Sequence, residues 1–207
     1  MCGIFGATDR YIYKELYEDN QQRGSSSYGG AWIKKDGAGI VRSKQFITHP
    51  HNCDWYIGHT RAPTNANGFN KFHAHPFVAG GLISFHNGII QNAAQLATSL
   101  GVSVDIDSEI IPIICSQGSG DEVDNICKGL QKLDGIYGLA LYSTLTDSVY
   151  LARCACTLYA SSLGVFSSQK PSKHTGKLLE EGILYTITDC SLEEVGTFQY
   201  NSPYLVL

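Results

Sequence analysis

The sequence predicts an α+β fold in which stacked antiparallel sheets are covered by helices. Short apolar and β-branched runs recur along most of the chain, whereas helical periodicity is confined to four segments. Strands and a helix come first, further helices lie in the middle, and a long run of strands joined by short turns follows. This order differs from the regular alternation of strand and helix that builds a parallel doubly wound sheet.

The expected elements follow from these patterns. Strands are predicted at residues 3–7, 30–34, 55–60, 82–86, 137–143, 149–153, 158–161, 184–188 and 197–200. Helices are predicted at 11–22 after Asp9 as a cap, at 92–100 before Gly101, at 108–116 and at 121–133. Pro112 could lie in an early turn of the third helix or break it. Residues 161–176 are predicted to form an exposed loop.

Composition excludes several classes of function. The 207 residues are 43% hydrophobic, which is enough for one large domain, and their formal net charge is -4. Lys and Arg total only 15 and form no basic patch, so no nucleic-acid partner is expected. Neither a secretory signal nor a membrane-length apolar stretch is present, so we expect a cytoplasmic protein that does not bind membranes. Seven cysteines, an odd number, fit a reducing compartment.

Metal chemistry is not expected. Cys154 and Cys156 are separated by one residue, which is not the spacing of a zinc knuckle, and no second knuckle follows. No cofactor is predicted either.

Cys2 is the first candidate catalytic residue. Removal of Met1 would expose Cys2 as the N-terminal residue, with its own α-amine beside its thiol. The amine titrates at about 7.7–8.0 and the thiol at about 8.5, so the amine is suited to accept the thiol proton near neutral pH. One residue would then supply both nucleophile and base. The alternative is a buried cysteine that serves only as a small apolar side chain.

Three further segments carry polar groups that suit a free amino acid. Arg61 ends a predicted strand and offers a planar fork of donors for a carboxylate, although it could form a surface ion pair instead. Asn87 and Gly88 follow another strand. They could form a hairpin turn, or a strand-to-helix corner whose side-chain amide and backbone N–H make an oxyanion hole. Asp107 could cap a helix or bind the ammonium group of a substrate.

These segments together resemble a known family. The motifs are Met-Cys-Gly-Ile-Phe-Gly at 1–6, Arg23-Gly24, His59-Thr60-Arg61 through Thr64, Ala74-His75-Pro76, His86 to Asn92, Asp107-Ser108-Glu109 and Gly135 to Gly138. In this order they resemble the glutaminase domain of class II glutamine amidotransferases, the N-terminal nucleophile group. The resemblance is strongest to the glutaminase half of glucosamine-6-phosphate synthase.

The resemblance implies a fold and a set of roles. The fold is a four-layer αββα sandwich of two antiparallel sheets. Cys2 is the nucleophile, Asn87 and Gly88 form the oxyanion hole, Arg61 binds the α-carboxylate and Asp107 the α-amino group of L-glutamine. Thr64 and His75 match motif positions near the pocket. The implied reaction is attack on the glutamine amide, release of ammonia and hydrolysis of a thioester to glutamate.

The chain also departs from the family. The run after Gly24 is Ser25-Ser26-Ser27 and lacks the Asp that the family commonly has, and Ala62 replaces a Trp that helps to gate the ammonia channel in glucosamine-6-phosphate synthases. We therefore expect residues 1–207 to form a single glutaminase domain without an acceptor domain, which supplies ammonia to a synthetase or transferase in trans. The alternatives are an amidohydrolase for another small amide or γ-glutamyl compound, and a non-catalytic binding or regulatory module.

Overall fold

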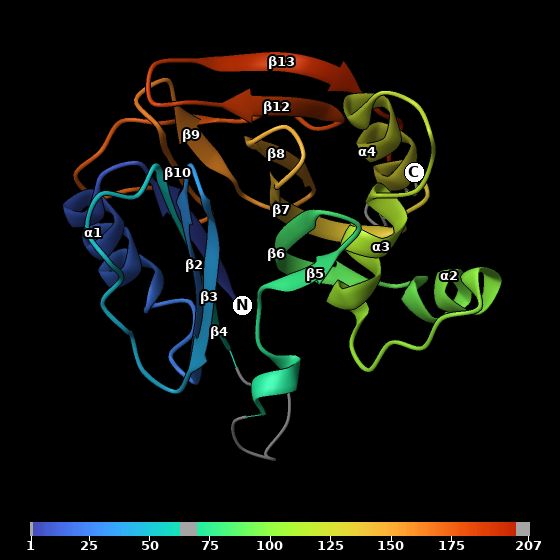
Figure 1. Cartoon of the computed structure of the whole chain (residues 1–207), viewed down its shortest axis with the longest axis horizontal. Coiled ribbons are helices and arrows are strands. Elements are labelled where there is room, and N and C mark those ends of the chain that lie inside the picture. Colours follow the sequence, from blue (N-terminus) through green and yellow to red (C-terminus); the bar gives the residue numbers. More distant parts are fainter. Residues whose placement is uncertain (1, 63–69, 202–207) are drawn as a thin grey trace.

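Two antiparallel sheets stack face to face in the computed structural model, which describes residues 2–62 and 70–201 (Figure 1). In spatial order the first sheet contains β11 (Lys177–Leu178), β9 (Tyr159–Ser161), β10 (Val165–Ser167), β1 (Gly3–Ala7), β4 (Trp55–Arg61), β2 (Ser27–Lys34) and β3 (Gly37–Ser43). The second contains β13 (Leu192–Thr197), β12 (Ile183–Ile187), β8 (Ser148–Cys154), β7 (Gly135–Ser143), β6 (Leu82–Ile90) and β5 (Phe77–Ala79).

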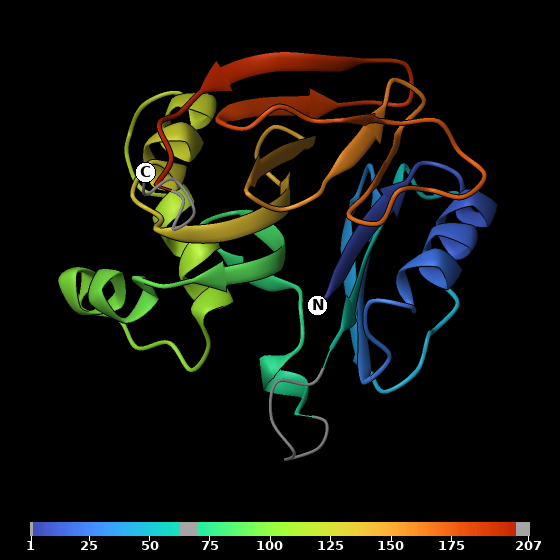
Figure 2. The ribbon, with the colours of Figure 1, turned by 180° about the vertical axis from the view of Figure 1, so that it is seen from behind.

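Helices cover the two outer faces of this sandwich. Helix α1 (Arg10–Asn20) lies on the first sheet, and α2 (Ala93–Leu100), α3 (Ile110–Cys115) and α4 (Glu122–Leu130) lie beside the second, as Figures 1 and 2 show from opposite sides. Short 3-10 helices at Lys71–His73 and Asp107–Glu109 complete the described elements. The predicted four-layer arrangement is confirmed.

Three hydrophobic clusters correspond to the three contacts between layers. The central cluster joins the sheets through side chains such as Ile4 of β1 and Phe85 of β6. Phe5, the next residue along β1, belongs instead to the cluster beneath α1. Leu82 and Ile90 of β6 lie in the cluster beneath α2, α3 and α4. Since successive strand side chains point to opposite faces, each central strand supplies two of the clusters.

The helix ends follow the predicted signals. Asp9 caps α1, because its Oδ1 accepts hydrogen bonds from the backbone N–H groups of Tyr11 at 2.7 Å and Ile12 at 2.9 Å. Gly101 ends α2 in the left-handed conformation, with φ of 67°. The predicted helix at 108–116 is divided between a 3-10 turn and α3. Pro112 lies in the first turn of α3, where a proline needs no backbone donor.

Two strand predictions and one loop prediction need correction. The strand predicted at 82–86 continues to Ile90, so Asn87 and Gly88 lie within β6 and not at a strand-to-helix corner. The strand predicted at 197–200 lies earlier, at Leu192–Thr197. A tight turn, in which the Thr188 backbone N–H donates to the Ser191 carbonyl, ends directly before it. The predicted loop at 161–176 contains β10, a buried strand that pairs with β1 and β9.

Two observations bear on the composition arguments. All seven cysteines lie in the described residues, and all are free. No helix of the described residues is long and apolar enough to cross a membrane.

Candidate active site

Cys2 lies directly before β1, at the edge of the space between the sheets. Its carbonyl oxygen accepts a hydrogen bond from Arg23 Nε at 3.1 Å, and Arg23 Nη1 donates to the Ser168 carbonyl at 2.6 Å. Burial raises the pKa of the Cys2 thiol, although a hydrogen bond from the Ala62 backbone and the charge of Arg61 lower it. The thiol is therefore protonated near neutral pH, and nucleophilic attack requires a base.

Arg61 ends β4, the strand that pairs with β1. One of its guanidinium nitrogens, Nη1, donates to the His73 carbonyl at 2.7 Å. That bond fixes the side chain while using only one of its five N–H donors. The backbone behind it is tightly packed, since a Cβ on Gly24 would lie 2.4 Å from the Arg61 carbonyl carbon. Only glycine fits there, which explains the Arg23-Gly24 motif.

Asp107 begins the 3-10 turn that precedes α3 and is tied to β6. Its Oδ2 accepts a hydrogen bond from the Ile90 backbone N–H at 2.7 Å, and its Oδ1 accepts one from Ser108 Oγ at 3.3 Å. Because an ionised carboxylate offers about four acceptor sites, these two bonds leave capacity for a ligand. Asp107 is thus a fixed negative group on the wall opposite the first sheet.

Asn87 and Gly88 occupy neighbouring positions of β6 and belong to opposite faces of its sheet. Asn87 is buried, and its side-chain Nδ2 donates to Cys156 Sγ at 3.6 Å. Gly88 has φ of 144°, and a Cβ there would lie 1.9 Å from the Ile136 carbonyl oxygen. The glycine is required by both the backbone conformation and the adjacent strand.

Three buried histidines lie side by side next to these groups. The ring centroids of His59 and His75 are 4.0 Å apart, and those of His75 and His86 are 6.3 Å apart. Burial lowers the pKa of His59 to about 3, and it lowers the pKa of His75 and His86 as well. All three are therefore neutral near pH 7. His86 Nδ1 is paired with Ser108 Oγ at 2.8 Å, whereas both ring nitrogens of His75 have no hydrogen-bond partner within the described residues.

One pocket of about 110 Å³ collects these groups. It is lined by Cys2, His59, Arg61, Ala62, His73, His75, His86, Gly88, Ile106, Asp107 and Ser108. Five of the residues that we singled out from the sequence for a site therefore share one cavity: Cys2, Arg61, His75, Gly88 and Asp107. Asn87 lies beside the cavity without lining it, and Thr64 falls outside the described residues.

The structure places further residues at the site to which the sequence assigned no role there. His59, His86 and Ser108 line the pocket, and Cys156 contacts Asn87. His59 and His86 stand inside recognisable motifs, so a signal was present for them. Cys156 carries no such signal, because it is brought to Asn87 only by the pairing of distant strands.

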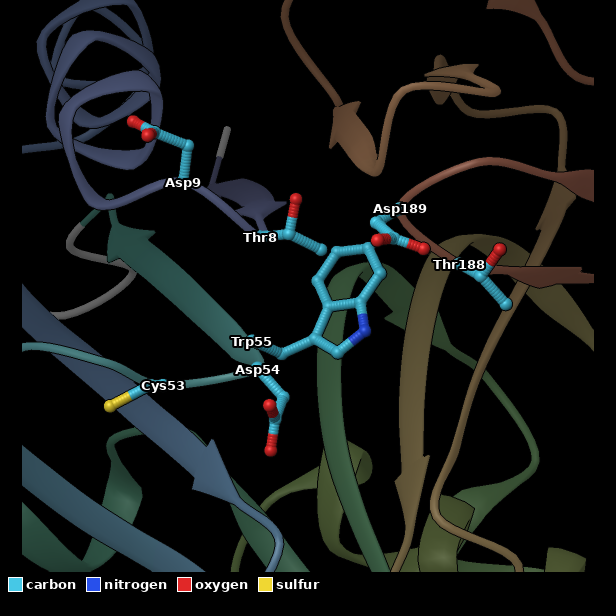
Figure 3. A pocket seen from close by; sticks show the side chains of 7 residues that line it. All are labelled: Thr8, Asp9, Cys53, Asp54, Trp55, Thr188 and Asp189. Atoms are coloured by element: carbon cyan, nitrogen blue, oxygen red, sulfur yellow. The ribbon is translucent and has the colours of Figure 1, made fainter.

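A larger hollow of about 570 Å³ lies at the other ends of β1 and β4, where Thr8 follows β1 and Trp55 begins β4. Figure 3 shows its lining side chains, which include Asp9, Asp54 and Asp189. Asp9 already caps α1. In the described part of the chain no group of His, Cys, Asp or Glu residues could hold a metal ion.

Comparison with known proteins shows the family to which the chain is related. No family model matches the chain. A curated relative from Symbiobacterium thermophilum, a glutamine–fructose-6-phosphate aminotransferase (isomerizing), is 30% identical in an alignment 178 residues long, which covers 76% of this chain and 29% of the relative. The Pyrococcus horikoshii enzyme of the same name is 31% identical in an alignment 180 residues long, which covers 74% of this chain and 29% of that enzyme.

Solved structures share the fold. A glutamine phosphoribosylpyrophosphate amidotransferase from B. subtilis matches 96% of this chain and 49% of its own, with a TM-score of 0.74 and 20% identity. An allosteric regulatory enzyme of purine biosynthesis matches the same shares, with a TM-score of 0.79 and 21% identity. The chain belongs to the class II glutamine amidotransferases. Members of this family use an N-terminal nucleophile. The chain spans about three tenths of the length of the curated relatives that it matches.

Proposed function

We propose that this class II amidotransferase chain hydrolyses the side-chain amide of L-glutamine through a thioester at Cys2, releasing glutamate and ammonia. The observation that carries the proposal is the single pocket in which a thiol, a guanidinium and a carboxylate meet, at Cys2, Arg61 and Asp107. The sequence relationship to glutamine-dependent aminotransferases supports it.

The two charged groups suit the polar end of a free amino acid. Arg61 would bind the α-carboxylate, since a guanidinium matches a carboxylate with two parallel hydrogen bonds. Asp107 would bind the α-ammonium group with the acceptor sites that Ile90 and Ser108 leave open. With the polar end held in this way, the glutamine side chain extends toward Cys2. His75 lines the same pocket and would contribute to the wall of the binding site.

The chemistry requires that Met1 has been removed. The α-amine of Cys2 takes the thiol proton, and the sulfur attacks the amide carbon to give a tetrahedral oxyanion. The amine then passes its proton to the leaving nitrogen, the C–N bond breaks, and ammonia departs. Water attacks the resulting γ-glutamyl thioester while the amine accepts a proton from that water. The C–S bond then breaks, the amine returns the proton to the sulfur, and glutamate leaves free Cys2.

Asn87 Nδ2 and the Gly88 backbone N–H would stabilise the oxyanion. Loss of one donor of this kind costs about 3–4 kcal/mol in the transition state of other acyl-transfer enzymes. Gly88 lines the pocket beside Cys2. Asn87 extends from the next position of the same strand.

We further propose that the ammonia passes to a separately encoded acceptor enzyme. Free ammonia is largely protonated at neutral pH and diffuses away, so a partner that docks over the pocket would improve transfer. The small side chain of Ala62 on the pocket wall, where glucosamine-6-phosphate synthases have the gating Trp, supports a partner different from the sugar-isomerising one. An immunoblot of the source cells tests this proposal. A band near 22.5 kDa is expected, and a single larger polypeptide that also carries the acceptor would contradict it.

Glutamate release from L-glutamine tests the hydrolytic function. We expect turnover by the purified chain whose intact mass shows loss of Met1, and none by Cys2→Ala. Equal release by both proteins would contradict the proposal. If other amides or γ-glutamyl compounds are turned over faster than L-glutamine, the substrate belongs to that other class and the proposed glutamine specificity is wrong.

A further inference from the structure

We propose that Cys156 is a positioning residue that holds the Asn87 carboxamide in the orientation needed to bind the oxyanion. The inference rests on the proposed function and assigns a role to the Cys154-Ala155-Cys156 segment, which metal chemistry does not explain.

Asn87 and Cys156 form a closed pair of hydrogen bonds. Asn87 Nδ2 donates to Cys156 Sγ at 3.6 Å, and the Cys156 thiol donates to the backbone carbonyl of Asn87 at 3.5 Å. Both residues are buried, with 1% and 7% of their surfaces exposed. A carboxamide carries two N–H donors. The bond to sulfur occupies one donor and fixes the rotation of the group, and the second N–H is then set in a defined direction.

The backbone explains how Cys156 reaches Asn87. Cys154, the last residue of β8, packs in the cluster beneath α2, α3 and α4, where its thiol donates to the Gly135 carbonyl at 3.4 Å. Ala155 then has φ of 50°, in the left-handed region that few non-glycine residues adopt. This change of backbone direction lets the thiols of Cys154 and Cys156 donate to the carbonyls of different residues, Gly135 and Asn87.

Arg153 fixes the segment on its other side. Its Nη1 donates to the Cys156 carbonyl at 3.0 Å and to Glu181 Oε1 at 2.8 Å. The Cys156 backbone is thus held by Arg153, which is itself fixed by its ion pair with Glu181, while the Cys156 sulfur is held by Asn87.

Asn87 and Cys2 face the same space between the sheets. Asn87 pairs with Gly138 of β7, and a Cβ on Gly138 would lie 3.9 Å from Ile4 Cδ1. Cys2 directly precedes β1 and lies two positions before Ile4, so the strand alternation, continued by one residue, places both side chains on one face. The carboxamide that Cys156 holds is therefore on the strand opposite the nucleophile.

A second connection joins the same segments. Arg23 donates to the Cys2 carbonyl at 3.1 Å and to Oγ1 of Thr157, the neighbour of Cys156, at 3.1 Å. Arg23 thus connects the backbone at Cys2 with the side chain of the residue that follows Cys156.

The protonation state of Cys156 fits this role. Burial raises the pKa of its thiol, although the charge of Arg23 acts in the opposite direction. A neutral thiol can donate to the Asn87 carbonyl and accept from Nδ2, whereas a thiolate could not donate. Cys156 therefore acts as a fixed neutral donor and acceptor and not as a second nucleophile.

Steady-state kinetics of Cys156→Ala and Cys156→Ser test the inference. We expect Cys156→Ala to lower kcat by about tenfold or more with KM changed less than about threefold, because a misdirected donor weakens mainly the transition state. Cys156→Ser should stay within about threefold of the unmodified chain, since a hydroxyl can make both bonds. Cys154→Ala is the matched control and should keep its kcat, because its sulfur bonds Gly135 and not Asn87.

Binding of glutamate γ-semialdehyde provides a readout that a merely structural role would not change. Its carbonyl carbon bonds to Cys2 Sγ and the thiol proton passes to the new oxygen, which gives a tetrahedral hemithioacetal in the oxyanion site. Cys156→Ala should bind this aldehyde about tenfold more weakly, with unchanged affinity for L-glutamate. If Cys156→Ala does not fold, Cys156→Val fills the volume without either bond and takes its place.

The outcomes separate the two proposals. A chain that hydrolyses glutamine normally when Cys156 is replaced by Ala or Val overturns the positioning role and leaves the proposed function intact. Equal losses in the Ser and Ala variants also overturn it. An unmodified chain that lacks Met1 and does not turn over glutamine overturns the proposed function, and this inference with it.

Discussion

Arg61 and Asp107 lie on two walls of a pocket whose three buried histidines are neutral. Burial keeps His59, His75 and His86 uncharged near pH 7, and burial likewise favours the neutral thiol of Cys2. A zwitterionic amino acid that enters the pocket therefore meets one fixed cation and one fixed anion, with no competing charge from these three histidines. This separation of charge gives the site its expected preference for a free amino acid over an amide without an α-carboxylate.

Replacement of either charged residue should weaken binding of glutamine. We expect Arg61→Met and Asp107→Asn each to raise KM for glutamine by about tenfold to a hundredfold, because a hydrogen bond to a charged group contributes about 1.5–3 kcal/mol. Steady-state glutamate release measures the change. Arg10→Met and Asp105→Asn are matched controls outside the pocket lining and should leave KM unchanged. Equal KM values for the pocket variants and their controls would contradict these roles.

At the residue level the sequence predicted much of the pocket, but not the contacts within it. Cys2, Arg61 and Asp107 could be selected because each residue type has a distinct chemistry and a recognisable neighbourhood. The Cys156 contact with Asn87 spans 69 positions and depends on how β6, β7 and β8 pair. The ring contact between His59 and His75 depends likewise on the way the first sheet meets the 70–76 segment.

Strand β6 shows where local pattern and tertiary structure disagree. Asn-Gly is a strong turn signal, yet Asn87 and Gly88 continue the strand and pair with Gly138 and Tyr137 of β7. Pairing with a full-length central strand outweighs the turn preference of the two residues. The positive φ of Gly88 remains as the local feature that the glycine makes possible.

Gly88→Ala should damage both stability and activity. Gly37 is a matched control because its φ of 145° is nearly the same as the 144° of Gly88, while a Cβ there meets nothing within 4 Å. Both substitutions carry backbone strain of about 1–3 kcal/mol. Only Gly88→Ala adds the clash with the Ile136 carbonyl, which we expect to lower the free energy of unfolding by a further 1–3 kcal/mol or so.

Urea unfolding of the two variants measures that difference. Glutamine turnover should fall in Gly88→Ala and stay unchanged in Gly37→Ala. Equal losses of stability in both would show that the approach of Ile136 to Gly88 is not as close as described.

The strands and helices were predictable to different degrees. Helices α1 and α2 could be placed because Asp9 and Gly101 act through local hydrogen bonds and backbone conformation. Strand β3 was missed because it is an edge strand with two glycines and an irregular apolar pattern. Strand β10 was missed because it has only three residues, and its burial depends on pairing with β1 and β9.

Over the whole molecule, the sandwich buries three titratable side chains of the site between its layers. His59, His75 and His86 are each at most 5% exposed. The fold class followed from the order of the elements along the chain, but the sheet order did not, because β1 and β10 pair across 158 to 162 positions. The histidines become buried only when these distant strands have paired, so the free-energy cost of burying them depends on the complete fold.

Stability should fall in acid for this reason. The unfolded chain binds protons on histidines near pH 6.5, whereas the folded chain does not protonate His59 until its pKa of about 3, and the pKa values of His75 and His86 are lowered too. The stability is fully present above pH 6.5 and is lost as the pH falls toward the folded values. Each histidine then contributes a slope of at most about 1.4 kcal/mol per pH unit.

Urea unfolding between pH 7 and pH 5 measures the slope. His75→Asn should reduce it, while His51→Asn, at an exposed histidine beside Arg10, should not. A free energy of unfolding that stays constant over this range would contradict the neutral, buried state of the three rings.

The most direct test of the whole account is to trap the acyl intermediate. The chain without Met1 is mixed with L-glutamine, quenched in acid during turnover, digested and weighed by mass spectrometry. The N-terminal peptide that begins at Cys2 should gain the mass of glutamine minus ammonia, and the peptide of Cys2→Ala should gain nothing. Glutamate release without any adduct at Cys2, or with an adduct at another cysteine, would contradict the assignment of the nucleophile.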